Sequence, residues 1–384
     1  MTEIARSGLG KPLAPGHSGE HPSHVGYDTP SPEGSELFSI KHGVVLTVFQ
    51  LDNVSNATTG LRLWQAETDI SGISWTAPHP FVIPGLHADN VTDGTHMAPG
   101  NGIELQHGPC AGRLLAVLIL AAPDVVVYSD DGGESWQLSE TPLPGGEAQL
   151  AEVRTPDGRT AVIFNSRLKS PHKRGVAWSR DCGRSFTDIR EADDLTGGTS
   201  CDSSIISLDQ HPVRDAAVAA NGSSLLFSHP SGKDRTHKAG RNGGVLLQSN
   251  DYAETWREVG SATPEDESAK FGYSNLNHLP AEASDTLTVG LTYETEAEGC
   301  DPALESSACT IIYRTFEFAA LVAKTDDSEV QQSPTNSRAD PMETAARELQ
   351  RRIDEAVTSG APSLRVAGGE YNVRPAPSAG HATW

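Results

Sequence analysis

The chain has 384 residues, enough for one large core or two domains, and its 37 glycines and 25 prolines favour many short strands joined by turns. Acidic residues exceed basic residues by 22 (51 against 29), which disfavours binding to nucleic acid or to an anionic membrane through bulk charge. No apolar run approaches 18 residues, so the sequence predicts no transmembrane helix.

The first 26 residues are polar and rich in Gly, Pro and His, without the apolar core of a signal peptide. We expect this segment, 1–26, to be disordered. The five cysteines lack CxxC spacing, so we predict no zinc site, no other metal and no cofactor. Cys300 and Cys309 could form a disulfide in an oxidising compartment. The sequence does not decide the cellular compartment of the protein.

Short apolar runs predict strands along most of the chain. Residues 44–49 and 60–64 form the first two, and residues 112–120 form a third. Later runs at 224–227 and 245–248 have the same character, so the sequence indicates an all-β fold.

A hairpin signature of the form Ser-x-Asp-x-Gly-x-x-Trp recurs between these strands. Residues 129–136 carry it complete, residues 179–186 have Phe for Trp, and residues 249–256 have Ala for Gly. Residues 69–75 hold an incomplete version. In such a turn Asp can bond backbone amides and Gly supplies a positive φ. One hairpin per unit of about 40–50 residues is typical of β-propeller blades, so these residues fasten blades and carry no chemistry.

The character of the sequence changes after residue 318. Residues 321–340 form a polar linker, and residues 344–357 have apolar residues at helical spacing. Residues 360–373 resemble the helix-then-strand opening of a right-handed parallel β-helix. We therefore predict a helix and a truncated β-helix-like tail over 341–384.

Serial hairpins of this form resemble the sialidase (neuraminidase) superfamily of glycoside hydrolases, the Asp-box or BNR-repeat propellers, over about residues 27–318. The resemblance implies a six-bladed β-propeller at 27–320, and the tail adds a short helical C-terminal appendage. Because the same hairpins occur in propellers that are not enzymes, the fold does not by itself establish activity.

The resemblance also implies site residues, and the first of them depart from the family pattern. Asp28 stands where the family has the first of three arginines that bind the substrate carboxylate, and an Asp there would repel that group. Asp52 matches the acid/base residue, with a solvated loop position as the alternative. Asn101 either lines the pocket or serves a turn. Whether another arginine, for instance Arg62, replaces the missing one is left open.

Four later residues match the family in its order. Glu147 matches the glutamate that partners the nucleophile, and Arg167 matches the second carboxylate-binding arginine. Arg241 matches the third, with Arg235 as a competitor in the same loop. Tyr273, which begins Tyr-Ser-Asn-Leu, matches the nucleophile.

The implied reaction is release of terminal sialic acid, or another nonulosonic acid, from glycoconjugates by a retaining exo-α-sialidase acting as a monomer. A neutral Tyr activated by Glu suits this substrate, because an attacking carboxylate would be repelled by the carboxylate at the anomeric carbon. The alternative is a catalytically impaired propeller that binds acidic glycans. The linkage and the exact sugar are not predicted.

Overall fold

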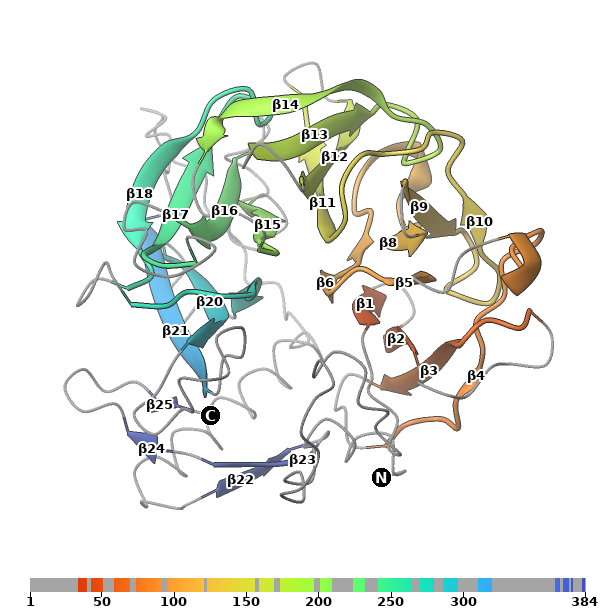
Figure 1. The fold of residues 1–384 in the computed structure, drawn as a ribbon, viewed down its shortest axis with the longest axis horizontal. Helices are drawn as coiled ribbons and strands as arrows, with labels where there is room; N and C mark the ends of the chain where they lie inside the picture. Colours follow the sequence, from red (N-terminus) through yellow and green to blue (C-terminus); the bar gives the residue numbers. More distant parts are fainter. Residues whose placement is uncertain are drawn as a thin grey trace, which may run out of the picture.

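The structure is a computed structural model, and the residues that it describes are 34–39, 43–50, 59–69, 74–90, 95–120, 123–155, 159–168, 173–196, 201–208, 224–231, 241–263, 269–279, 286–295, 310–319, 363–366, 369–372, 374–375 and 382–383. These residues form five sheets of four or five strands that stand around a common centre as the blades of a propeller (Figure 1). Neighbouring strands within a blade pair antiparallel, apart from β1 with β6. The predicted all-β propeller is confirmed.

The blades follow one another along the chain. The first holds β1 (Gly34–Ser39), β2 (Val44–Gln50), β3 (Leu63–Asp69) and β4 (His79–Pro80), and β6 (Gly100–Asn101) pairs with β1. The second holds β5 (Thr95–Met97), β7 (Ile103–Glu104), β8 (Leu114–Leu120), β9 (Asp124–Ser129) and β10 (Gln137–Leu138). Two short 3-10 helices, η3 (Ala88–Asn90) and η4 (Gly108–Cys110), lie in the connections.

The remaining three blades have the same meander order. The third holds β11 (Ala148–Arg154), β12 (Thr160–Arg167), β13 (Lys173–Ser179) and β14 (Thr187–Thr196), and the fourth β15 (Ser204–Ser207), β16 (Leu225–Pro230), β17 (Gly244–Ser249) and β18 (Arg257–Ser261). The fifth holds β19 (Ser274–Leu279), β20 (Thr286–Thr295) and β21 (Thr310–Ala319), extended by β25 (Ala382–Thr383) and β24 (Arg374–Pro375). In Figure 1 the strands β1, β6, β11 and β15 lie toward the centre, and β4, β10, β14 and β18 lie outside.

The predicted number of six blades is wrong for the part of the chain that the structure describes, which forms five. The first strands of successive blades begin at residues 34, 95, 148, 204 and 274, so each blade takes more than 50 residues. The number six came from the resemblance to the sialidase superfamily, and the hairpin signatures indicated units of about 40–50 residues. Longer loops between strands enlarge each unit, and the same stretch of chain therefore holds fewer blades.

The three hairpin boxes, residues 129–136, 179–186 and 249–256, each connect the third and fourth strands of a blade. In the first box Ser129 Oγ accepts a hydrogen bond from the Gly133 amide at 2.8 Å, and Asp131 Oδ1 accepts one from the Ser135 amide at 2.9 Å. Partial burial disfavours the ionised form of Asp131 and so acts to raise its pKa. Hydrogen bonds from Ser135 and Ser129 outweigh this effect and hold the pKa of Asp131 below the usual value. The equivalent bonds recur in the other two boxes.

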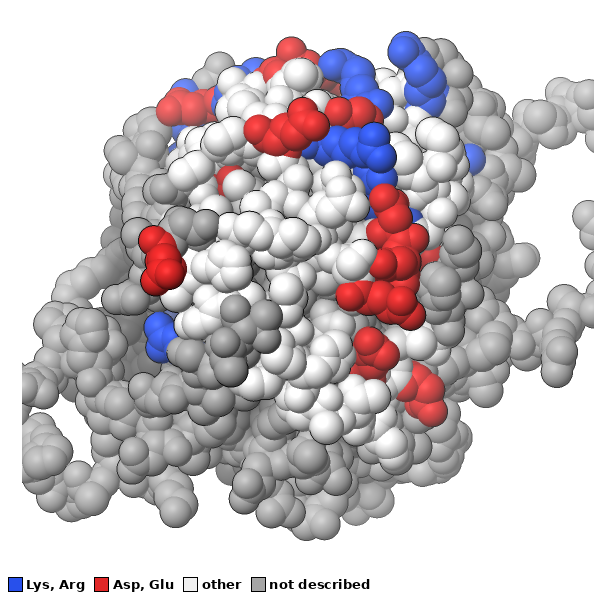
Figure 2. Space-filling model, turned by 90° about the vertical axis from the view of Figure 1, so that its right-hand side faces the viewer, with Lys and Arg blue, Asp and Glu red and all other residues white. Residues whose placement is uncertain are grey.

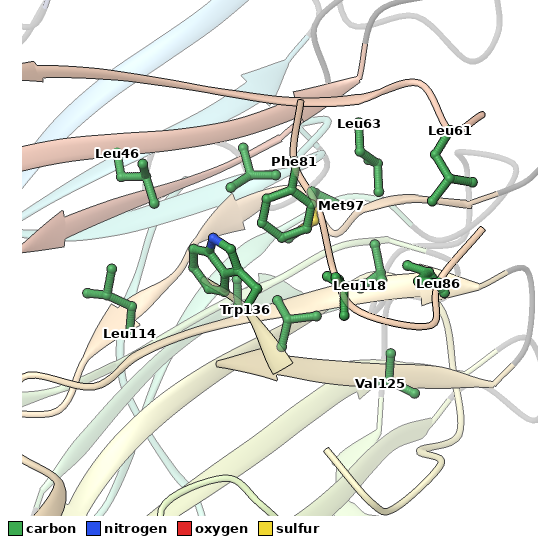
Figure 3. Packing of buried hydrophobic residues seen from close by; sticks show 14 residues of the cluster. Leu46, Leu61, Leu63, Phe81, Leu86, Met97, Leu114, Leu118, Val125 and Trp136 are labelled. Atoms are coloured by element: carbon green, nitrogen blue, oxygen red, sulfur yellow. The ribbon is translucent and has the colours of Figure 1, made fainter. Parts of the chain in front are cut away.

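The aromatic residue of each box packs on the preceding blade. Trp136 is 1% exposed and lies in the core between the first two blades, with its ring 5.2 Å from that of Phe81 (Figure 3). Its indole nitrogen donates to Gln65 Oε1 in β3 at 3.1 Å. Phe186 and Trp256 contact Phe164 and Phe227 of their own blades, within clusters that also contain residues of the preceding blades. The boxes thus join neighbouring blades as well as closing their own turns.

A disulfide joins the second and third blades. Cys110 in η4 is bonded to Cys182 in the second box, with 6.3 Å between the Cα atoms. The carbonyl of Cys182 also accepts a hydrogen bond from Arg113 at 3.0 Å. The sequence considered only Cys300 with Cys309, which lie outside the described residues.

The C-terminal strands divide into two groups. β25 pairs with β21 of the fifth blade, whereas β22 (Ser363–Val366) and β23 (Gly369–Asn372) pair with each other as an antiparallel hairpin. The predicted disordered segment, linker and C-terminal helix lie outside the described residues, and the β-helix-like character of the tail stays a prediction. In the described part, no helix is long and apolar enough to cross a bilayer.

Candidate active site

The candidate site forms where strands of the third, fourth and fifth blades begin or end. Glu147 directly precedes β11, and Arg167 is the last residue of β12. Because β11 and β12 are antiparallel neighbours, these two residues meet at one end of the blade, where the Arg167 amide donates to the Glu147 carbonyl at 2.8 Å. Tyr273 directly precedes β19, and Arg241 lies in the segment before β17.

The side chains of these four residues come together. The Tyr273 hydroxyl donates a hydrogen bond to Glu147 Oε1, and Arg167 Nη1 donates to Glu147 Oε2. Arg167 Nη1 also donates to the Tyr273 hydroxyl oxygen at 3.2 Å. The guanidinium of Arg241 lies 5.2 Å from the centre of the Tyr273 ring. A phenol, its proton acceptor and two cations therefore share one small region.

Burial and the neighbouring charges keep this phenol neutral. Burial raises the pKa of Tyr273, and the carboxylate of Glu147 raises it further, while Arg167 and Arg241 oppose the shift. The site is nevertheless open to solvent, since the side chains of Arg167 and Glu147 are 25% and 18% exposed. Glu147 is the base in contact with the Tyr273 hydroxyl and is placed to accept its proton.

Glu294 is a further acidic residue at this site, and the sequence did not single it out. Its amide donates to the Tyr273 carbonyl at 3.0 Å, because β19 and β20 form a hairpin with Ser274 opposite Tyr293. Burial raises its pKa, and the charge of Arg241 works against that shift. A Cβ added at Gly272 would lie 2.9 Å from Glu294 Oε2, so only glycine fits there without displacing the carboxylate. Pairing the predicted strands would have revealed this neighbour.

Asn101 lies at the hub and bonds to the fifth blade. Its Nδ2 donates to the Leu276 carbonyl at 3.2 Å and to Asn277 Oδ1 at 3.0 Å, and its Oδ1 accepts from Asn275 at 3.1 Å. These contacts join β6 to β19 through side-chain amides. The structure therefore brings Asn101 to the inner strands, where its side chain is hydrogen-bonded to β19.

A buried polar layer lies beside the cluster, between the third and fourth blades. Arg174 is 6% exposed, Asn165 1% and Asp202 2%. Burial raises the pKa of Asp202 to about 7, and the nearby Arg174 opposes this shift. Sequence reasoning missed this layer, because Arg174 follows a lysine at the start of a strand and looks like a surface residue.

Three residues discussed from the sequence cannot be placed. Asp52, Asp28 and Arg235 lie outside the described residues. Arg62 is described, and its neighbours Leu61 and Leu63 pack in the core between the first two blades. Among the described residues, no group of three or more His, Cys, Asp and Glu side chains is arranged to hold a metal ion.

The surface carries charge of both signs in separate areas. On the face drawn in Figure 2, acidic side chains form a band beside a broad area of uncharged side chains, and basic side chains gather toward one end. The whole chain has a formal net charge of −22. In this acidic protein the two arginines of the site supply the positive charge that an anionic ligand would need, beside the carboxylates of Glu147 and Glu294.

Comparison with known proteins identifies relatives of this chain. No protein-family profile matches it. The chain is 31% identical to a sialidase of Micromonospora viridifaciens over 230 residues, which cover 58% of this chain and 32% of that protein. It is 28% identical to sialidase-3 of Rattus norvegicus over 187 residues, covering 38% of this chain and 44% of that protein. The chain thus spans less than half the length of these two curated relatives.

A solved structure shares the fold. The intramolecular trans-sialidase from Ruminococcus gnavus, in complex with oseltamivir carboxylate, superposes with a TM-score of 0.54 at 16% identity, covering 76% of this chain and 79% of that one. At this identity the likeness concerns the fold alone. The chain is thus similar to sialidases in sequence and to a trans-sialidase in fold.

Proposed function

We propose that the chain is a retaining exo-α-sialidase that releases terminal sialic acid, or another nonulosonic acid, from glycoconjugates. The observation that carries the proposal is the contact of the Tyr273 hydroxyl with the Glu147 carboxylate beside two arginines. A Tyr–Glu pair supplies a nucleophile without placing a second carboxylate against the substrate's own.

In the proposed reaction Arg167 and Arg241 hold the substrate carboxylate through charge-assisted hydrogen bonds. The Tyr273 oxygen attacks the anomeric carbon as its proton passes to Glu147, and the bond to the leaving-group oxygen breaks. The leaving oxygen takes a proton from an acid, the role that the resemblance gives to Asp52. Water then attacks the anomeric carbon and gives a proton to the Asp52 carboxylate, while the bond to the Tyr273 oxygen breaks and Glu147 returns its proton to that oxygen. Tyr273 is thereby regenerated, and the anomeric configuration is retained.

The direct test is hydrolysis of a fluorogenic N-acetylneuraminate by the wild type and by Tyr273→Phe. The variant lacks only the hydroxyl, so we expect its kcat to fall by at least about 100-fold with little change in stability. Tyr128→Phe is the matched control, because the Tyr128 hydroxyl is also hydrogen-bonded, to Gln137 at 3.1 Å, but lies on β9 in the second blade. This control should keep its activity.

The outcomes separate the candidate functions. A wild type that binds sialic acid without turnover would instead be the glycan-binding propeller, and equal activity of Tyr273→Phe and wild type would exclude the tyrosine nucleophile. Analysis of the sugar product adds a further distinction. The R. gnavus relative is an intramolecular trans-sialidase, so an anhydro sugar rather than the free acid would indicate attack by the substrate's own hydroxyl group.

A further inference from the structure

One buried arginine bonds to both of the blades that carry the candidate carboxylate-binding arginines. Arg174, in β13 of the third blade, donates from Nε to Asn165 Oδ1 in the same blade at 2.7 Å. Its Nη1 donates to the carbonyl of Cys201, just before β15 of the fourth blade, at 3.0 Å. Its guanidinium also lies 5.5 Å from the centre of the Phe227 ring in the fourth blade. Arg174 therefore links the two blades at a fixed separation.

One end of this link lies beside Arg167, and the other end lies in the fourth blade, which carries Arg241. Asn165 precedes Arg167 by two residues on β12, so both side chains point to the same side of the sheet. Arg167 and Arg174 are also opposite each other in the β12–β13 register. At the other end, burial raises the pKa of the Cys201 thiol to about 12, and the charge of nearby Arg241 opposes the shift.

The charge of Arg174 is balanced within the same layer. Burial lowers the pKa of Arg174 to about 10, with Asp202 acting in the opposite direction, so the guanidinium stays charged at neutral pH. The Oδ1 atom of Asp202 is buried and has no hydrogen-bond partner. A buried guanidinium held by directed hydrogen bonds has little freedom to rearrange, which suits a rigid spacer.

We propose that Arg174 is a positioning residue that sets the separation of Arg167 and Arg241, and thereby the fit of the site to a substrate carboxylate. The inference rests on the proposed function. Two guanidinium groups from different blades can grip one carboxylate only if the blades keep their spacing, and a misplacement of about 1 Å can cost on the order of 100-fold in rate or affinity. A lysine at position 174 carries its donors on one nitrogen, so it cannot reproduce the planar fork by which Arg174 reaches Asn165 from Nε and the Cys201 carbonyl from Nη1.

The test compares Arg174→Lys with wild type on the fluorogenic N-acetylneuraminate. We expect KM to rise by about tenfold or more, and kcat to fall by a smaller factor, because the Tyr273–Glu147 pair itself is untouched. Asn165→Ser removes the acceptor at one end of the link and should raise KM in the same direction. Asn165→Ser therefore still tests the proposal if Arg174→Lys does not fold.

Arg113→Lys is the matched control, because Arg113 makes the same kind of link elsewhere. Arg113 is 4% exposed, donates to Asp130 Oδ1 at 2.8 Å, and donates to the Cys182 carbonyl of the next blade at 3.0 Å. Its replacement should lower stability while leaving KM unchanged. Hydrogen–deuterium exchange gives a second readout: Arg174→Lys should accelerate exchange at residues 165–168 and 201–204, and Arg113→Lys at 182–186.

If Arg174→Lys and Asn165→Ser change KM no more than Arg113→Lys does, the inference is overturned and the proposed function stands. If the wild type neither hydrolyses sialosides nor binds N-acetylneuraminic acid, the proposed function is overturned and the inference with it. Faster exchange at 201–204 without a change in KM would assign Arg174 a purely structural role.

Discussion

Replacing Gly183 in the second hairpin box by alanine tests how tightly neighbouring blades are joined. Gly183 has φ +84°, a conformation that costs a residue with a Cβ about 1 kcal/mol or more. A Cβ there would lie 2.3 Å from Cδ2 of Leu115 in the preceding blade, and Leu115 is 0% exposed. The Gly183 amide donates to Ser179 Oγ at 2.7 Å, so the backbone cannot move without weakening the turn.

The expected loss of stability follows from these two effects. Overpacking of a buried site costs about 1–3 kcal/mol, and adding the conformational cost gives about 2–4 kcal/mol for Gly183→Ala. With an unfolding entropy of about 2.1 cal/mol/K per residue over the chain, that loss lowers the melting temperature by roughly 2–5 °C. The measurement is thermal unfolding followed by circular dichroism, with denaturant titration as a second probe.

The third box supplies the control. Ala253 occupies the same place with φ +66° and is 2% exposed, so the protein already accommodates a Cβ there. Ala253→Gly relieves about 1 kcal/mol of backbone strain and loses a buried methyl group worth about 0.8 kcal/mol, which nearly cancel. An unchanged melting temperature for Gly183→Ala, or an equal loss for Ala253→Gly, would refute this account of the box.

Two further predictions concern stability. The Cys110–Cys182 bond closes a loop with a sequence separation of 72, so replacing both cysteines by serine should cost about 4 kcal/mol, and reductant should destabilise only the wild type in denaturant titrations. Between about pH 4 and 6.5, two buried titratable groups change the stability of the fold in opposite directions as the pH falls. Burial raises the pKa of Asp202 to about 7, so folding is favoured as pH falls, whereas burial lowers the pKa of His229 to about 3, so folding is disfavoured. As the pH falls by one unit, the unfolding free energy of His229→Gln should rise relative to wild type by up to about 1.4 kcal/mol, and that of Asp202→Asn should fall by up to about 1.4 kcal/mol. Parallel pH profiles of stability for the three proteins would contradict this prediction.

The sequence predicted the clustered site residues only through their order along a family pattern. Glu147 and Tyr273 are 126 residues apart, and nothing local relates them. The sequence did not reveal Arg174 and Glu294, whose roles depend on their burial in the folded protein. Arg174 follows a lysine, and Glu294 follows a tyrosine at the end of a strand, so neither has a local signature. The surroundings of Arg174 arise from the packing of the third and fourth blades, and those of Glu294 from the pairing of β19 with β20.

The amino-acid sequence alone determined the hairpin boxes, because Ser, Asp and Gly within eight residues make the bonds that close each turn. It also determined the all-β class, since short apolar runs between turns leave no other regular structure. The number of blades, the disulfide between Cys110 and Cys182, and the link made by Arg174 were decided by the tertiary structure. Each depends on how segments dozens of residues apart pack, and that spacing is set by loop lengths and burial rather than by any local pattern.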